Sequence, residues 1–153
     1  MGGRRININL YNVCEPESKV GIRAFNGVFA SRVDMLACRA EILNAEDRAL
    51  MKMHLKSGFT FRQIAQVAGT TEAKIARRIH RLSSKLVDGE YIKCLKNRER
   101  FTRMELMVAK DHYLDGMSIK NIGKKREMSI YMVRQVLEKA RKIVNESERK
   151  RVK

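Results

Sequence analysis

An internal repeat limits the fold of this chain more than any other feature of its sequence. When the sequence is shifted by 58 positions, so that Gly58 meets Gly116, residues 43–87 align with residues 101–145. Other aligned pairs keep their chemical type: His54 with His112, Ile64 with Ile122, Thr71 with Ser129, Ile75 with Val133 and Ile79 with Leu137. Self-similarity at a fixed offset is typical of one structural unit that is used twice. We therefore expect two related domains, at 43–87 and 101–145.

Each repeat has the start and stop signals of three short helices. The first helix should begin at Asn44-x-x-Asp47 or at the capping-box pattern Thr102-x-x-Glu105. It should end at Gly58 or Gly116, because glycine tolerates the left-handed conformation found at helix ends. The second helix should span 61–68 and 119–126, after the caps Thr60-x-x-Gln63 and Ser118-x-x-Asn121, and Thr71 and Ser129 are caps for the third.

The composition favours an all-α fold. The chain has 153 residues and is 44% hydrophobic, which is enough for modest cores. Only 6% of its residues are aromatic and runs of β-branched residues are few, which argues against a sandwich or barrel. We expect two tandem three-helix, helix-turn-helix repeats, joined by a polar linker at 88–100 and followed by a basic tail at 146–153.

Residues 1–42 differ in character from the repeats. Ile6, Ile8 and Leu10 alternate with asparagines, which indicates a short strand or an extended arm. Apolar residues then recur at steps of three and four, which predicts a leading helix near 28–42: Phe29, Val33, Leu36, Ala40 and Leu43. Two roles fit this stripe, packing against the first repeat or forming the seam of a homodimer.

The third helix of the first repeat, expected over 71–86, has one apolar face and one basic face. At about 100° per residue, one stripe holds Ile75, Ile79, Leu82 and Leu86. The opposite face holds Lys74, Arg77, Arg78, Arg81 and Lys85. Like charges at this spacing repel, and only Glu72 and the neutral His80 soften the face. A polyanion would turn that repulsion into binding through phosphate contacts and counterion release, whereas the alternative is a merely solvated helix face.

The segment before this helix has helix-turn-helix spacing. Ala65 is the small residue at which two helices approach closely, and Gly69 occupies the turn. Ile75 follows Ile64 by eleven positions and holds the last helix across the second. In this arrangement the N-terminal end of the third helix faces the major groove of DNA.

Residues 43–86 resemble region four, the DNA-binding domain, of bacterial sigma factors and its helix-turn-helix relatives, in Ile64-Ala65, Thr71-x-x-x-Ile75 and the ending Leu82-Ser83-Ser84-Lys85-Leu86. The resemblance implies a third helix that reads promoter bases in a domain that also touches RNA polymerase. Carried over by position, it implies base-edge contacts from Thr71, Glu72, Ala73, Lys74 and Arg77, and phosphate contacts from Arg78, Arg81 and Lys85. Residues 1–42 are too short to resemble the sigma region that grips the polymerase core, so a complete sigma factor is not expected.

The second repeat departs from this pattern. Gly123 replaces Ala65, and Glu127 stands where Gly69 made the turn. Its third helix presents Tyr131, Gln135, Glu138 and Lys142 outward instead of a nearly pure row of cations. Contacts to the DNA backbone are still expected from its basic residues: Lys124, Lys125, Arg126, Lys139, Arg141 and Lys142. Tyr131 and Gln135 complete the DNA-binding set expected in this repeat.

The charge, the cysteines and the absence of known motifs limit the classes of function that this sequence supports. The 33 Lys and Arg against 17 Asp and Glu give a formal charge of +16, which suits a polyanionic partner. Cys14, Cys38 and Cys94 predict neither a disulfide framework nor a zinc site, and they fit a reducing cytoplasm. No export signal, membrane span or catalytic motif is visible, so we expect a cytoplasmic protein without membrane contact, enzymatic activity or cofactor.

The function expected from these features is binding of double-stranded DNA, in the service of transcription regulation. Two alternatives stay open. The chain could be an interaction module that docks on RNA polymerase with secondary DNA contact, or the DNA-targeting subunit of a recombinase whose catalytic centre lies on another chain.

Overall fold

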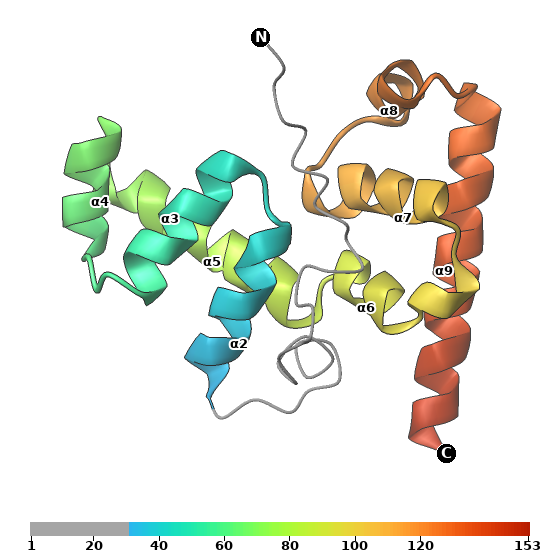
Figure 1. Cartoon of the computed structure of the whole chain (residues 1–153), viewed down its shortest axis with the longest axis horizontal. Helices are drawn as coiled ribbons and strands as arrows, with labels where there is room; N and C mark the ends of the chain where they lie inside the picture. The colour runs from blue at the N-terminus through green and yellow to red at the C-terminus, as the bar shows by residue number, and fades with distance from the viewer. Residues whose placement is uncertain (1–30) are drawn as a thin grey trace, which may run out of the picture. The chain divides into compact units, whose positions relative to one another are not determined.

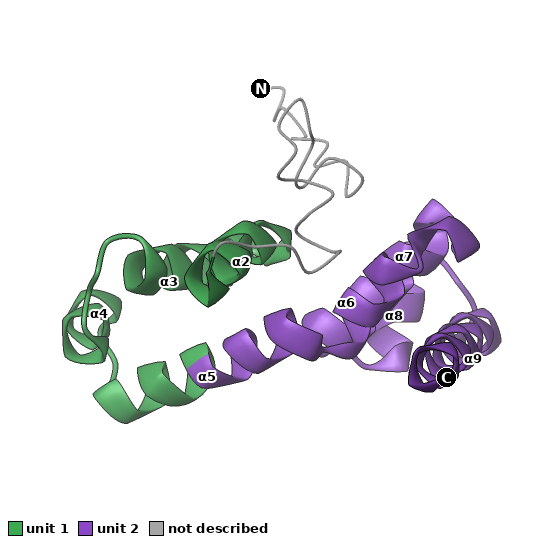
Figure 2. Cartoon of the chain, turned by 90° about the horizontal axis from the view of Figure 1, so that it is seen from below, with its two compact units in different colours: residues 1–79 green, residues 80–153 purple. Residues whose placement is uncertain are grey.

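The computed structural model describes residues 31–153, which form helices and contain no strand (Figure 1). The predicted all-α fold is confirmed for this part of the chain. The chain divides into two compact units, residues 1–79 and 80–153 (Figure 2). The division lies within one continuous helix, α5 (Glu72–Asp88), and not at residue 87, where we expected the first domain to end.

Unit 1 is built from short helices that bury their apolar faces together. They are α2 (Arg32–Arg39), the 3-10 turn η1 (Ala40–Ile42), α3 (Ala45–Leu55), α4 (Phe61–Ala68) and the N-terminal half of α5. Each contributes buried side chains: Leu36, Ala40, Ile42, Leu43, Leu50, Met51, Ile64, Ala65, Ile75 and Ile79. The helix starts follow the predicted caps, since Asn44 Oδ1 accepts a hydrogen bond from Asp47 N and Thr60 forms a capping box with Gln63.

Unit 2 continues from the C-terminal half of α5. It contains α6 (Glu90–Lys96), the 3-10 turn η2 (Arg98–Arg100), α7 (Arg103–Ala109), the π-helical turn η3 (Lys110–Leu114), α8 (Ile119–Arg126) and α9 (Ile130–Val152). Val108, Ile122, Val133 and Leu137 form a central apolar cluster of this unit. Thr102, Ser118 and Ser129 cap α7, α8 and α9, as the sequence predicted.

The two repeats have similar backbone structure at the ends of their first helical segments and in their second helices, although the first segment of repeat two passes from α7 into the π-helical turn η3 where α3 stays α-helical. Gly58 and Gly116 end the first helical segments with φ angles of 67° and 69°. The backbone hydrogen bonds at these ends also correspond. Ser57 N donates to Lys52 O at 3.2 Å, and its counterpart Asp115 N donates to Lys110 O at 3.1 Å. Phe59 N donates to Met53 O at 3.1 Å, and its counterpart Met117 N donates to Asp111 O at 2.9 Å. The helices α4 and α8 begin and end where the caps predicted, so the sequence repeat is a repeat of local structure.

The segment 88–100 is not the polar linker that we expected. Four side chains of α6, Tyr91, Ile92, Cys94 and Leu95, are buried in unit 2. Only Gly89 separates α5 from α6, and a β-carbon there would lie 2.3 Å from the Lys85 carbonyl oxygen. The charged residues interspersed among the four apolar ones made the segment look polar, although their spacing is that of one buried helix face.

Outside the two repeats, the structure bears on three predictions: the basic tail, the leading helix and the cysteines. Residues 146–153 are not a loose basic tail, because α9 extends to Val152. The leading helix begins at Arg32, and its stripe packs inside unit 1 through Leu36, Ala40 and Leu43; the expected arm and Phe29 lie outside the described residues. Cys38 is disulfide-bonded, whereas the cysteine spacing predicted no disulfide framework.

Candidate nucleic-acid interface

The helix α5 carries the predicted apolar stripe into the interior. Ile75, Ile79, Leu82 and Leu86 are at most 4% exposed, so this part of the prediction is confirmed. The basic residues lie on the remaining surface of the helix, where the structure separates them into two groups. Two of the five bind groups of the protein, and the other three make no ion pair within residues 31–153.

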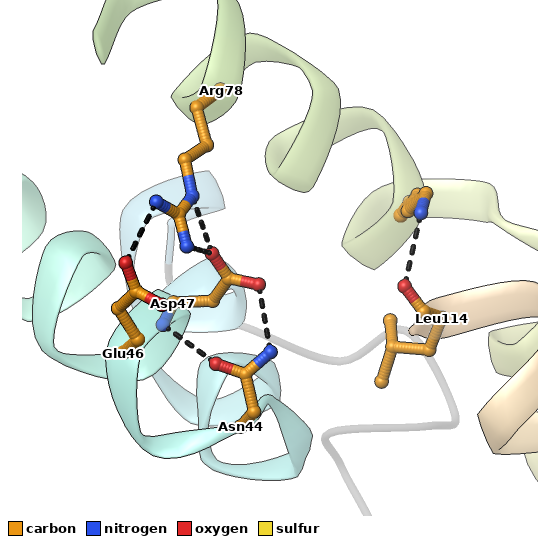
Figure 3. A network of polar contacts seen from close by, with 6 residues as sticks. Asn44, Glu46, Asp47, Arg78 and Leu114 are labelled. Atoms are coloured by element: carbon orange, nitrogen blue, oxygen red, sulfur yellow. Dashed lines mark hydrogen bonds and ion pairs between the residues drawn. The ribbon is translucent and has the colours of Figure 1, made fainter. Parts of the chain in front are cut away.

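Arg78 is held by two carboxylates at the start of α3 (Figure 3). Its Nε donates to Asp47 Oδ1 at 2.7 Å, and its NH1 donates to Glu46 Oε1 at 3.0 Å. Asp47 is itself fixed by Asn44, whose Nδ2 donates to Asp47 Oδ2 at 3.0 Å. The hydrogen bond to Glu46, with those to Asp47, raises the pKa of Arg78 above its ordinary value despite partial burial. The expectation that the basic face has little internal compensation is therefore wrong for Arg78.

Lys85 lies at the other end of the basic face. Its Nζ donates to the backbone carbonyl oxygen of Leu114 in η3 at 3.0 Å (Figure 3). This hydrogen bond joins α5 to η3 inside unit 2, and Lys85 is half-buried. Its ammonium group has a structural partner, in addition to any role toward phosphates that the resemblance implied.

The remaining cations form a free row on α5. Lys74, Arg77 and Arg81, here named the α5 cation row, are exposed and make no ion pair in the described part of the chain. Their spacing of three and four residues places them on one face of the helix. Thr71 and Glu72, at the start of the same helix, are also exposed, and Thr71 Oγ1 accepts a hydrogen bond from Lys74 N.

The turn before α5 has the geometry that the sequence predicted. Gly69 ends α4 in the left-handed conformation, with φ 65° and ψ 37°. Ile64 and Ala65 of α4 are buried, as is Ile75 of α5. The left-handed turn at Gly69 thus connects two helices that both bury apolar side chains in unit 1, while Lys74 and Arg77 of the cation row stay exposed on α5.

In unit 2, several basic residues that we expected to contact DNA form ion pairs with carboxylates of the protein. Asp111, which is 1% exposed, accepts hydrogen bonds from Lys125 Nζ at 2.7 Å and Arg126 Nε at 2.7 Å. Burial alone would raise the pKa of Asp111, but the hydrogen bonds from Arg126 and Lys125 outweigh it and hold the pKa below its ordinary value. Asp111 thereby ties the end of α8 to η3, and these two cations are structural.

Two further candidates on α9 are also paired. Lys139 Nζ binds both carboxylate oxygens of Glu105, at 2.9 and 2.8 Å, and Lys142 Nζ lies 3.2 Å from Glu138 Oε1 one turn away. The Lys142 pair is exposed and therefore weak. Four candidates in this repeat are exposed and form no ion pair within the described residues: Lys124, Tyr131, Gln135 and Arg141.

Sequence reasoning missed the neighbours of Tyr131. Ile130 and Met132 are exposed beside it, Arg134 is an exposed cation one turn after Ile130 on α9, and Lys120 is an exposed cation in the first turn of α8. The signal was present in the alignment of the repeats, because Ile130, Tyr131 and Met132 correspond to Glu72, Ala73 and Lys74. Two charged residues and an alanine are thus replaced by three large apolar or aromatic residues, which marks a change in what the surface contacts.

Comparison of the chain with family models, curated proteins and solved structures gave no match. Within residues 31–153, no group of three or more His, Cys, Asp or Glu side chains is placed to hold a metal ion. None of the helices in that range combines the length and the hydrophobicity needed to cross a bilayer.

Proposed function

We propose that this protein binds double-stranded DNA and regulates transcription, through two tandem helix-turn-helix modules that comprise α3–α5 and α7–α9. The observation that carries the proposal is the α5 cation row. Lys74, Arg77 and Arg81 are exposed on one helix face, and no carboxylate neutralises them within the part of the chain that is described. Phosphates that pair with such a face release condensed counterions, which favours binding to a nucleic acid.

The arrangement supports a division between affinity and sequence preference. Thr71, Glu72, Lys74 and Arg77 lie at the N-terminal end of α5, the part that enters the major groove in helix-turn-helix proteins. Arg and Lys recognise guanine by its O6 and N7, whereas a glutamate accepts from the cytosine amino group. We assign Arg81, one turn further along α5, to the phosphate backbone, which contributes affinity without base preference.

Arg78 and Lys85 have a different role in this proposal. Both are basic, but Arg78 binds Asp47 and Glu46 in unit 1. Lys85 binds the carbonyl oxygen of Leu114 in unit 2. They are positioning residues that fix each half of α5 against its own unit. We therefore assign DNA contact in α5 to the cation row and its preceding turn, and not to all five cations.

Titration of the full chain into a labelled random-sequence duplex at several salt concentrations tests the proposal. We expect tight binding at low salt, with a slope of log affinity against log salt that reports the phosphate contacts. Replacing Lys74, Arg77 and Arg81 by Gln should weaken binding and reduce that slope by about 0.9 for each phosphate that is no longer neutralised. Lys56→Gln, which removes an exposed cation at the end of α3, is the matched control and should change little.

Absence of duplex binding by the wild-type chain at low salt would refute the proposal. Equal binding by the triple variant and the Lys56→Gln control would refute the assignment of the contact to α5. A reporter gene placed behind a selected binding sequence then tests the regulatory role, and its output should change only when the cation row is intact.

A further inference from the structure

The first turn of α9 exposes three consecutive apolar side chains. Ile130 is 46% exposed, Tyr131 is 69% exposed and Met132 is 52% exposed; we name them the apolar tip. A run of exposed apolar residues costs solubility and is not expected on a surface without a function. Tyr131 adds a hydroxyl group at the outer end of this surface. The apolar tip is therefore a candidate contact surface of unit 2.

The apolar tip occupies the place that the α5 cation row begins to occupy in unit 1. Ser129 caps α9 by accepting from Met132 N at 3.1 Å, as Thr71 accepts from Lys74 N at 3.4 Å. The preceding turns also correspond, with Met128 N bound to Gly123 O at 2.9 Å and Thr70 N bound to Ala65 O at 3.0 Å. The same backbone presents polar and basic groups in one repeat and apolar groups in the other.

The surroundings of the apolar tip are positively charged. Lys120 and Lys124 on α8 and Arg134 on α9 are exposed, and none forms an ion pair within the described residues. Segment 118–136 contains five basic residues and one acidic residue, Glu127, and two of the five, Lys125 and Arg126, are paired with Asp111. Figure 1 shows α8, which carries Lys120 and Lys124, leading through a short turn into the start of α9, where Arg134 follows Ile130 by one turn. An apolar centre with a cationic rim fits a polyanion that also offers apolar groups.

We propose that the apolar tip recognises the C5-methyl groups of thymines in the major groove, while Lys120, Lys124 and Arg134 bind the flanking phosphates. Thymine is the base that presents a methyl group on the major-groove edge, and apolar side chains are the groups that contact it. This inference rests on the proposed DNA binding and adds a base preference to it. The two repeats would then read bases by different chemistry, the first through Lys74 and Arg77 and the second through the apolar tip.

The test compares two pools of random-sequence duplex that are identical except that one is synthesised with deoxyuridine in place of thymidine. Uracil pairs with adenine as thymine does but lacks the C5-methyl group. We expect the wild-type chain to prefer the thymine pool by roughly fourfold for each methyl group that it covers, the factor for burying one methyl-sized group. Competition between the pools for the full chain measures this ratio directly.

Two variants make the ratio specific to the apolar tip. Replacing Ile130, Tyr131 and Met132 together by Gln, a good helix former, should remove the preference while leaving α9 intact by circular dichroism. Val152→Gln, at the 89% exposed opposite end of the same helix, is the matched control and should keep the wild-type ratio. Arg77→Gln should weaken binding to both pools equally and also keep the ratio.

Each outcome has one meaning. Equal affinity of the wild-type chain for both pools would overturn the thymine inference and leave the proposed DNA binding intact. A preference that survives in the triple variant would also overturn it, because the methyl contact would then lie elsewhere. Failure to bind either pool would refute the proposed function itself.

Discussion

The guanidinium group of Arg78 binds the carboxylate of Asp47, which lies 31 positions earlier in the chain, with Nε 2.7 Å from Oδ1. Asp47 is in the first turn of α3, and Arg78 is near the middle of α5, so the pair joins two helices of unit 1. A residue that looks like part of a DNA-binding row is thus a structural contact. Its neighbour Arg77 has no such partner in the described range and stays available to a ligand.

Substitution of Arg78 and Arg77 should separate these roles. We expect Arg78→Gln to lower the free energy of unfolding by about 1 to 2 kcal/mol, because hydrogen bonds to two carboxylates are removed at a partly exposed site. Arg77→Gln should change it by less than about 0.5 kcal/mol, as is usual for surface positions. Thermal or denaturant unfolding measures both values, and equal destabilisation by the two variants would contradict the assignment.

The left-handed conformation of Glu127 predicts a stabilising substitution. Glu127 has φ 55° at the end of α8, where Gly69 has φ 65° at the end of α4. The left-handed conformation costs a residue with a β-carbon about 1 to 2 kcal/mol, and glycine avoids this cost. Glycine also makes the unfolded chain more flexible, which cancels part of the gain in stability. We expect Glu127→Gly to raise the free energy of unfolding by about 0.5 to 1 kcal/mol. Glu127→Ala is the control, and a comparable gain from it would show that the charge, not the backbone, matters.

The buried carboxylate of Asp111 predicts acid sensitivity of unit 2. Because hydrogen bonds from Arg126 and Lys125 lower its pKa in the folded state, its stabilisation is present above the ordinary value of 3.8 and is lost as the pH falls below it. We expect Asp111→Asn to cost about 2 to 3 kcal/mol at neutral pH. The difference in unfolding free energy between wild type and Asp111→Asn should shrink as the pH falls toward the folded-state pKa. A difference that stays constant down to low pH would contradict this role of the carboxylate.

The thiol of Cys94 should be unreactive in the folded protein. Burial in α6 raises its pKa to about 12, with a smaller contribution from Glu90. At pH 8 a thiol of that pKa is a thiolate in only about one molecule in ten thousand, and the thiolate is the reactive form. We expect iodoacetamide to leave Cys94 unmodified in native protein and to modify it in guanidinium chloride. Peptide mass spectrometry distinguishes it from the other cysteines, and fast native labelling would mean that α6 is not packed as described.

The burial of α6 could not be predicted from its own residues. Tyr91, Ile92, Cys94 and Leu95 have the spacing of a buried helix face, yet the charges between them made 88–100 look like a linker. The repeat alignment reinforced the error, because it placed this segment between two units of equal length. Whether such a segment is buried depends on an apolar surface elsewhere to receive it, which a local pattern cannot reveal.

The caps that begin the helices, the glycine turns and the repeat itself could be derived from neighbouring residues, whereas the C-terminal end of α9 at Val152 could not. Thr60 with Gln63, Thr102 with Glu105 and the turn at Gly69 act within a few positions, so their effect can be derived from neighbouring residues. The division of α5 into a buried and an exposed face was equally local, since the helical period decides it. These features would be expected from any fold that uses the same helices.

Contacts between residues far apart in the chain separate the paired cations from those that are available to a ligand. Arg78 meets Asp47 across 31 positions, Lys139 meets Glu105 across 34, and Arg126 meets Asp111 across 15. None of these pairs has a helical spacing, so no local rule brings them together. Hydrogen bonds and charge interactions depend on distance in space and not on distance along the chain. For that reason the sequence could not distinguish Lys74, Arg77 and Arg81 from the neighbouring cations that are paired in the folded protein.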